Sequence, residues 1–120
     1  MGQSYRDLFV WEKAMTLVKE VYRVTKLFPR DELYGPTSQL RRAAVSVPSN
    51  IAEGQARFSS REFHHFLSHA RGSLVEVETQ LLIAKDLEYI DANQAECLFK
   101  LTAETGRLLN RLIASIATAA

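Results

Sequence analysis

The chain has 120 residues, a length that fits one domain over residues 1–120 with a core that needs no disulfides. Fifteen Lys and Arg stand against fourteen Asp and Glu, so the net charge of +1 does not by itself indicate a nucleic-acid partner. A single Cys excludes an internal disulfide, and the sequence contains no apolar run of about 18 residues that would span a membrane. No secretory signal opens the sequence, so we expect a cytoplasmic protein without a membrane partner.

A first amphipathic helix is predicted from Asp7, whose carboxylate can cap the first turn, to Phe28, because Pro29 stops it. Its apolar residues form two adjacent rows at heptad spacing, which together cover about half of the circumference. One row suffices for a simple bundle, so the second favours either a deeply embedded helix or a subunit interface, for which we select Val10 and Leu17. The two rows are Trp11, Met15, Val18, Tyr22 and Val10, Ala14, Leu17, Val21, Val24, Phe28.

The second predicted helix begins at Pro36, because the first helical position does not need the N–H that proline lacks. Pro48 falls inside this helix and predicts a kink, and the helix ends at Gly54 or continues to Arg57. Its apolar residues form two stripes that are together wider than the single stripe of a surface helix. This helix should therefore be covered on two sides, and the stripe of smaller residues supplies the remaining predicted oligomer contacts: Val45, Pro48 and Ala52.

Two further helices are predicted after this one. A capping box at Ser59 opens the third helix, whose apolar residues repeat at alternating intervals of three and four up to Leu87. We interpret Gly72-Ser73 near its middle as a point of close approach to a neighbouring helix. Asp91 and Gln94 form a second capping box for the fourth helix. The four helices and their short connections predict an all-α, antiparallel, up-down-up-down four-helix bundle.

A compact polar group lies beside the predicted kink of the second helix. It consists of Ser46, Ser49, Asn50 and Glu53. One interpretation is a buried or interfacial hydrogen-bond network that holds the kink at Pro48. The other is a site for a small ligand or a protein partner, and Asn50 can serve in either.

Four arginines are the candidates for phosphate contact: Arg41, Arg42, Arg57 and Arg61. Guanidinium groups pair bidentately with phosphate oxygens, and a symmetric ring would repeat each of them. The alternative is structural ion pairing, because Glu53 and Arg57 are spaced i,i+4 in the favourable order and Arg42 can pair with a neighbouring chain. No aromatic residue interleaves the basic positions, which argues against sequence-specific reading of single strands.

The sequence contains little evidence for a catalytic or metal centre. Glu62 and His65 have the Glu-x-x-His spacing of di-metal carboxylate bundles, and His69 lies one turn after His65, but the second motif that such a site requires is missing. These histidines then belong to an exposed polar face of the third helix, and the alternative is an adventitious metal site at its surface. Cys97 has no His close to it in sequence, and we interpret it as a small helix-packing residue. We therefore predict no catalytic residue, no metal, no cofactor and no enzymatic activity.

Runs of residues spread from Asp7 to Ile113 match the pattern of one known family. With these runs the chain resembles the small bacterial four-helix bundle family named after the intervening-sequence protein of 23S ribosomal RNA, which also includes the accessory protein of diversity-generating retroelements. The block from Arg41 to Gly54 is highly specific. The runs are Asp7-Leu8-Phe9-Val10-Trp11-Glu12-Lys13-Ala14, Phe28-Pro29, Glu32-Leu33-Tyr34-Gly35, Gln39-Leu40-Arg41-Arg42-Ala43-Ala44-Val45-Ser46-Val47-Pro48-Ser49-Asn50-Ile51-Ala52-Glu53-Gly54, Phe66-Leu67 and Ala70-Arg71-Gly72-Ser73-Leu74.

The resemblance implies an assembly of five bundles around a central axis, a ring-like homopentamer. It also implies association with nucleic acid in the retroelement branch, where the protein is the partner of a reverse transcriptase. We therefore predict a non-enzymatic oligomeric scaffold or accessory protein that holds structured RNA or DNA, or a nucleic-acid-processing protein, on a basic face. The alternative is a protein-interaction assembly that has no affinity for nucleic acid.

Overall fold

The computed structural model describes residues 4–119, with side chains up to residue 116. Four α-helices make up most of this part of the chain, and it contains no β-strand, which confirms the all-α class. They are α1 (Phe9–Thr25), α2 (Ser38–Gln55), α3 (Ser60–Asp86) and α4 (Ala92–Ala119). The molecule is elongated along the helix axes, with extents of 46 × 24 × 19 Å.

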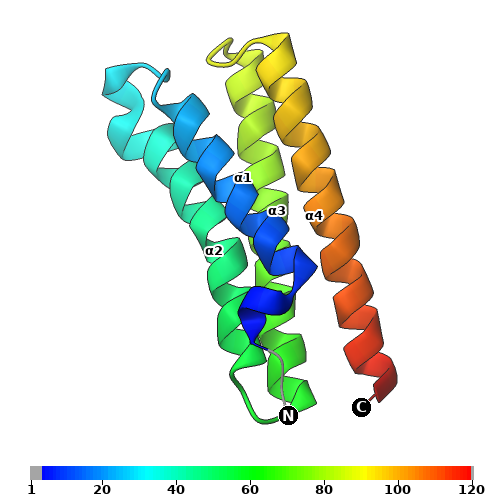
Figure 1. The fold of residues 1–120 in the computed structure, drawn as a ribbon. Helices are drawn as coiled ribbons and strands as arrows, with labels where there is room; N and C mark the ends of the chain where they lie inside the picture. The colour runs from blue at the N-terminus through cyan, green and yellow to red at the C-terminus, as the bar shows by residue number, and fades with distance from the viewer. Residues whose placement is uncertain (1–3, 120) are drawn as a thin grey trace.

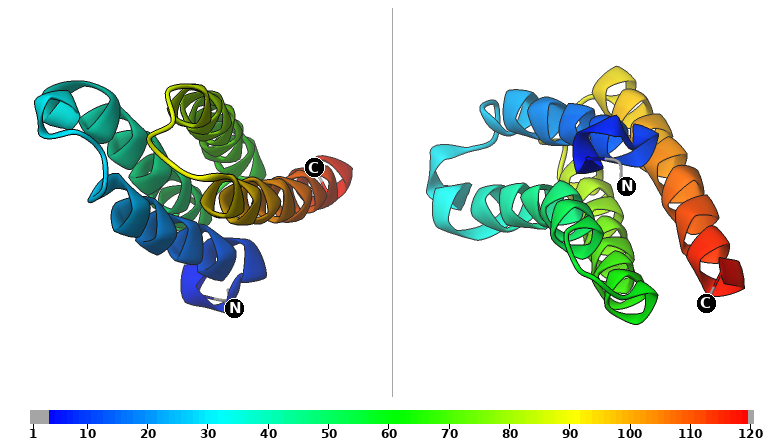
Figure 2. Two further views of the ribbon diagram at one scale, coloured as in Figure 1. Left: turned by 90° about the horizontal axis from the view of Figure 1, so that it is seen from above. Right: turned by 60° about the horizontal axis from the view of Figure 1, so that its bottom comes forward.

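The helices form a bundle in which α1 packs against α2 and α4, and α3 packs against the same two helices. Following the colours in Figure 1, the chain runs up α1, down α2, up α3 and down α4, so that the N and C marks lie at the same end. The view from above places α1 and α3 on opposite sides of the bundle (Figure 2). Each helix thus keeps one side in the core and one outside it.

The first helix differs from its predicted bounds at both ends. Asp7 is not its N-cap, because residues 5–7 form a separate 3-10 turn in which the Ser4 hydroxyl accepts a hydrogen bond from the backbone N–H of Arg6 at 3.2 Å. Leu8 is extended, and α1 begins after it. At the other end, Phe28 lies beyond α1, and its backbone N–H bonds to the Thr25 carbonyl three residues earlier, as in a tightened last turn.

The connector between α1 and α2 also shifts the start of the second helix. Arg30–Glu32 form a 3-10 turn and Leu33–Thr37 a π-helical turn, in which Gly35 has φ −120° and ψ −113°. Pro36 belongs to this turn, so α2 begins at Ser38, two residues later than predicted. Helical structure continues without interruption through Pro48.

Gly54 lies in the last turn of α2, which ends at Gln55, between the two predicted ends. A Cβ atom at Gly54 would lie 2.8 Å from Phe66 Cβ and 2.9 Å from Phe63 Cδ1 of α3, so here two helices approach so closely that only glycine fits. The close approach predicted at Gly72-Ser73 does not involve Gly72, because a Cβ atom there would have no neighbour within 4 Å. The neighbouring Ser73 provides the contact to α2 instead, through Ser46.

The ends of α3 and α4 confirm both predicted caps. The Ser59 hydroxyl accepts from the backbone N–H of Glu62 at 3.1 Å, while Asp91 and Gln94 bond reciprocally at 2.7 and 3.0 Å. At the C-terminus of α3, Glu88 has a positive φ of 62°, and the backbone N–H of Tyr89 bonds to the Ala84 carbonyl at 2.8 Å. This pattern is a Schellman motif with a glutamate where glycine is usual.

Tyr89 joins the two connectors at this end of the bundle. Its hydroxyl donates to the Glu32 carboxylate at 2.7 Å, and its ring lies 5.3 Å from the ring of Phe28. The hydrogen bond to the carboxylate stabilises the protonated phenol and, with partial burial and the charge of Glu32, raises the pKa of Tyr89 above its usual value.

The core corrects part of the predicted oligomer interface. Val10 and Leu17 of α1 are 4% and 0% exposed. Their side chains are covered by the other helices of the same protomer, which leaves them no surface for a second subunit. Among the described residues, every buried side-chain nitrogen and oxygen atom has a hydrogen-bond partner.

Candidate interaction surfaces

An apolar groove runs along the outside of the bundle between α1 and α2. From α1 the groove receives the half-buried residues Trp11, Met15 and Val18, the row adjacent to Val10 and Leu17. From α2 it receives the stripe of smaller residues. Val45, at 39% exposure, is among the exposed large hydrophobic residues. We call this surface the α1/α2 groove, and its lining residues are Tyr5, Trp11, Met15, Val18, Val45, Pro48, Ser49 and Ala52.

A second apolar surface lies on α3. Val75, Leu82 and Ile83 are 57%, 48% and 47% exposed, although each is large and hydrophobic. Val75 and Leu82 are seven residues apart, so they lie on one side of the helix. We call these three residues the α3 stripe; sequence analysis did not select them.

The predicted polar group does not form a single network. Asn50 donates to the Ser46 carbonyl at 2.8 Å and to the Ser46 hydroxyl at 2.9 Å, and that hydroxyl is 2.8 Å from the Ser73 hydroxyl of α3. Ser49 lines the α1/α2 groove instead, and Glu53 pairs with Arg57. Ser46 and Asn50 therefore link α2 to α3, which supports the structural interpretation for these two residues.

The four candidate arginines lie in two separate places. Arg41 and Arg42 are near the start of α2 and Arg57 lies just beyond its end, and the helix from Arg41 to Gln55 spans about 21 Å at 1.5 Å per residue. Arg57 forms an ion pair with Glu53 at 3.0 Å, and its guanidinium lies 4.7 Å from the centre of the Phe66 ring. Arg61 is exposed near the start of α3. The predicted basic face thus divides, and the predicted alternative of structural pairing holds for Arg57.

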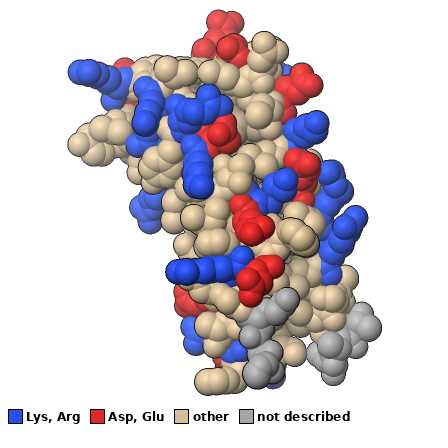
Figure 3. All heavy atoms as spheres, viewed as in Figure 1, with Lys and Arg blue, Asp and Glu red and all other residues tan. Residues whose placement is uncertain are grey.

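Arg41 lies close to two further cations, Lys26 and Arg30, which were not predicted from the sequence. Lys26, Arg30 and Arg41 line a cavity of about 360 Å³ between the end of α1 and the start of α2, and no carboxylate is among its lining residues. The Thr25 hydroxyl accepts a hydrogen bond from Arg41 Nε at 2.8 Å and holds the guanidinium in place. We call this the basic cavity, and Figure 3 shows Lys and Arg side chains gathered over this end of α1 and its connector.

These cations are free of intramolecular ion pairs. Within the described part of the chain, side-chain ion pairs join Arg23 to Glu20 and Arg57 to Glu53, and neither pair involves the basic cavity. Lys26 and Arg30 escaped prediction because they lie at a helix end and in a connector. Their proximity to Arg41 follows from the turn that brings α2 back along α1.

The histidines of α3 are exposed, as expected for a polar helix face, whereas the cysteine of α4 differs from expectation. His65 and His69 approach each other, with 3.3 Å between their Nε2 atoms. Among the described residues, no group of three or more His, Cys, Asp or Glu side chains is arranged to hold a metal ion. Cys97 is exposed, so its interpretation as a helix-packing residue is wrong.

Within residues 4–119, no helix combines the length and the apolar character needed to cross a lipid bilayer. Three surfaces of the described chain can contact a partner: the α1/α2 groove, the α3 stripe and the basic cavity. The first two are apolar, and the third carries positive charge.

Comparisons with known proteins identify the family. The chain is similar over its whole fold to a crystal structure, at 1.70 Å resolution, of a protein with unknown function from the S23 ribosomal protein family of Bacteroides thetaiotaomicron, with 24% sequence identity and a TM-score of 0.81. The match covers 88% of this chain and 95% of that one. No curated protein matches the sequence. The family model described as 23S rRNA-intervening sequence protein matches residues 6–111, and the chain therefore belongs to that family.

Proposed function

We propose that this protein is a non-enzymatic scaffold: an antiparallel, up-down-up-down bundle that assembles into a ring-like homo-oligomer. The observation that carries the proposal is the α1/α2 groove, where apolar side chains of two helices remain at the surface in one continuous patch. Covering such a patch contributes roughly 25 cal/mol for each Å² of apolar surface removed from water. The family resemblance implies five protomers.

The occupant of the groove is a second copy of the chain. A ring requires two different surfaces on each protomer, one of which binds the other on the next copy. The α1/α2 groove and the α3 stripe are two such surfaces, because α1 and α3 lie on opposite sides of the bundle (Figure 2). The stripe of each copy then packs into the groove of its neighbour, and repetition of this contact closes the ring.

The Val45→Asp variant tests the assembly. We expect particles of lower mass with unchanged helix content, because the carboxylate would be buried without a partner in the interface but remains solvated in the free protomer. Light scattering measures the mass, and circular dichroism measures the helix content. Leu82→Asp on the α3 stripe should have the same effect.

The matched control is Leu27→Asp, at an exposed apolar residue outside both surfaces. Its particle mass should equal that of the wild type. If Val45→Asp and Leu82→Asp also keep the wild-type mass, the groove and the stripe do not hold protomers together, and the proposal fails.

A second function is binding of structured RNA or DNA, alone or with a nucleic-acid-processing partner such as a reverse transcriptase. The basic cavity favours it, because three cations without intramolecular ion pairs surround a space large enough for a phosphate group. An assembly repeats this cavity once per protomer, so that a chain with a net charge of +1 still presents several local positive sites.

A salt series measures this binding. We expect the Lys26→Gln, Arg30→Gln, Arg41→Gln triple variant to bind a structured RNA less tightly and to reduce the slope of log affinity against log salt by about 2 to 3, since each lost phosphate contact removes about 0.7 to 0.9. The Arg57→Gln, Arg61→Gln variant is the control, and its slope should stay close to that of the wild type.

Two results would decide against nucleic acid. A wild-type assembly that binds neither RNA nor duplex DNA at low salt would leave the protein-interaction assembly as the function. A control variant that loses as much slope as the triple variant would show that binding is not located at the basic cavity.

A further inference from the structure

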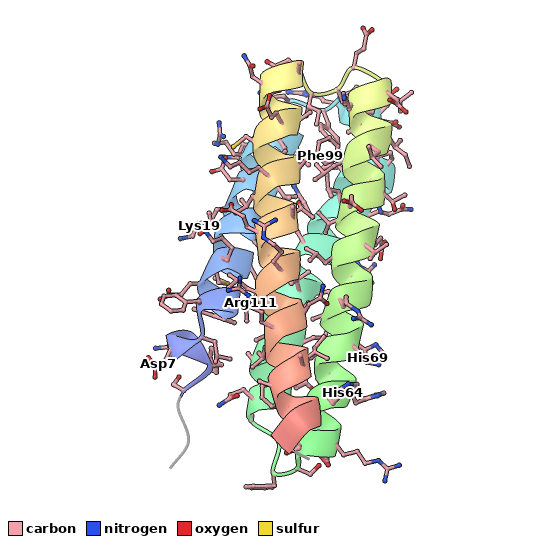
Figure 4. All side chains as sticks on the ribbon, turned by 90° about the vertical axis from the view of Figure 1, so that its right-hand side faces the viewer. Asp7, Lys19, His64, His69, Phe99 and Arg111 are labelled. Atoms are coloured by element: carbon pink, nitrogen blue, oxygen red, sulfur yellow. The ribbon has the colours of Figure 1, made fainter. Side chains whose placement is uncertain are left out.

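His65 and His69 lie one turn apart on the exposed side of α3, with 3.3 Å between their Nε2 atoms and an angle of 86° between their ring planes. Figure 4 shows His69 projecting from α3 away from the other helices. The His65 ring also contacts the edge of the Phe66 ring, at 5.8 Å between centres, which restricts its orientation. Neither ring is needed to fill the core, because both residues are exposed.

The distance between the two nitrogen atoms suits one metal ion. Zinc lies about 2.05 Å from a histidine nitrogen, and an ion at that distance from two atoms 3.3 Å apart subtends an angle of about 107° between them. This angle is close to that of a tetrahedron, the geometry that zinc adopts in proteins. Nε2 of each ring is free to be the ligand when Nδ1 carries the proton.

We propose that His65 and His69 form a two-histidine site for a divalent transition metal of the zinc type. The ion is bound by Nε2 of both rings, and water completes its coordination, since no third His, Cys, Asp or Glu of the described chain gathers with them. Imidazole nitrogen suits Zn²⁺, Ni²⁺ and Cu²⁺, whereas Mg²⁺ and Ca²⁺ prefer oxygen ligands. The site is independent of the proposed scaffold function.

Calorimetric titration with Zn²⁺ tests the site, using protein without an affinity tag. All variants carry Cys97→Ser, because Cys97 is exposed and a thiolate is a good zinc ligand that would add a second binding event. We expect one Zn²⁺ per chain in the parent protein and an affinity lower by roughly tenfold or more in His69→Ala, because loss of a direct ligand should cost at least as much as loss of a residue that orients one. His64→Ala is the matched control, since this neighbouring histidine is exposed on the same helix, and its affinity should be unchanged.

Cu²⁺ provides a readout of the ligand atoms. The electron paramagnetic resonance spectrum of the parent protein loaded with one Cu²⁺ should show coupling to two nitrogens, and that of His69→Ala should lose one. Equal Zn²⁺ affinities in the parent, His64→Ala and His69→Ala would overturn the proposal. So would a loss in His64→Ala as large as that in His69→Ala. Circular dichroism verifies that both variants stay helical.

Discussion

The Leu17→Ala variant is expected to lower the free energy of unfolding by about 2 to 5 kcal/mol, the cost of removing a large buried side chain and leaving a cavity. Leu17 is 0% exposed and lies where α1 meets the other helices, so water cannot fill the cavity that the shorter side chain would leave. Urea denaturation followed by circular dichroism measures the change. All proteins are compared at one protomer concentration, because association would add to the apparent stability.

Val45→Ala is the comparison for Leu17→Ala, since both residues were predicted at the same interface. Val45 is 39% exposed in the protomer, and its truncation should cost less than about 1 kcal/mol at concentrations where the protein is monomeric. If Leu17→Ala were as mild as Val45→Ala, the assignment of the Val10 and Leu17 row to the core would be contradicted.

Gly54→Ala is expected to destabilise the protein by about 1 to 3 kcal/mol, the usual cost of overpacking. The added Cβ would lie 2.8 Å from Phe66 Cβ, an atom fixed to the backbone of α3, so relief requires the two helices to separate. Gly54 has no positive φ, so backbone conformation does not contribute to the cost. Thermal unfolding measures the loss.

Gly72→Ala is the matched control and should change stability in the opposite direction. The new methyl group meets no atom within 4 Å, and alanine favours a helix over glycine by about 1 kcal/mol. Destabilisation of Gly72→Ala by as much as Gly54→Ala would show that the two losses come from something other than the contact with Phe66.

The helices were predictable because their signals are local. Ser59 and the pair Asp91 and Gln94 mark helix starts through contacts within one turn, and both were placed correctly. The prediction that Asp7 caps the first helix was wrong because Ser4 caps a separate 3-10 turn that contains Asp7. The prediction that α2 begins at Pro36 was wrong because the non-helical conformation of Gly35 extends the connector to Thr37. The fixed φ of proline is compatible with both a helix start and a turn, so it does not distinguish them.

The surfaces were less predictable because they depend on contacts between distant segments. Two apolar rows of α1 have the same spacing, and only the positions of α2, α3 and α4 decide that the row with Leu17 is buried while that with Trp11 lines the groove. Lys26 and Arg41 are likewise remote in sequence, and the connector between α1 and α2 brings them together. The four arginines share a charge, but Arg41 and Arg42 lie near the start of α2, whereas Arg57 and Arg61 flank the turn between α2 and α3.

The hydrogen bond from Tyr89 to Glu32 has a consequence for how the bundle opens. It joins the two connectors at one end across 57 residues of sequence, while the other end contains the α2–α3 turn and both ends of the chain (Figure 1). Local fluctuations that separate helices start where fewer links must break. We therefore expect the hydrogen-bonded backbone amides of residues 106–116 to exchange with solvent before those of residues 96–102, as the molecule loosens from the end opposite Tyr89.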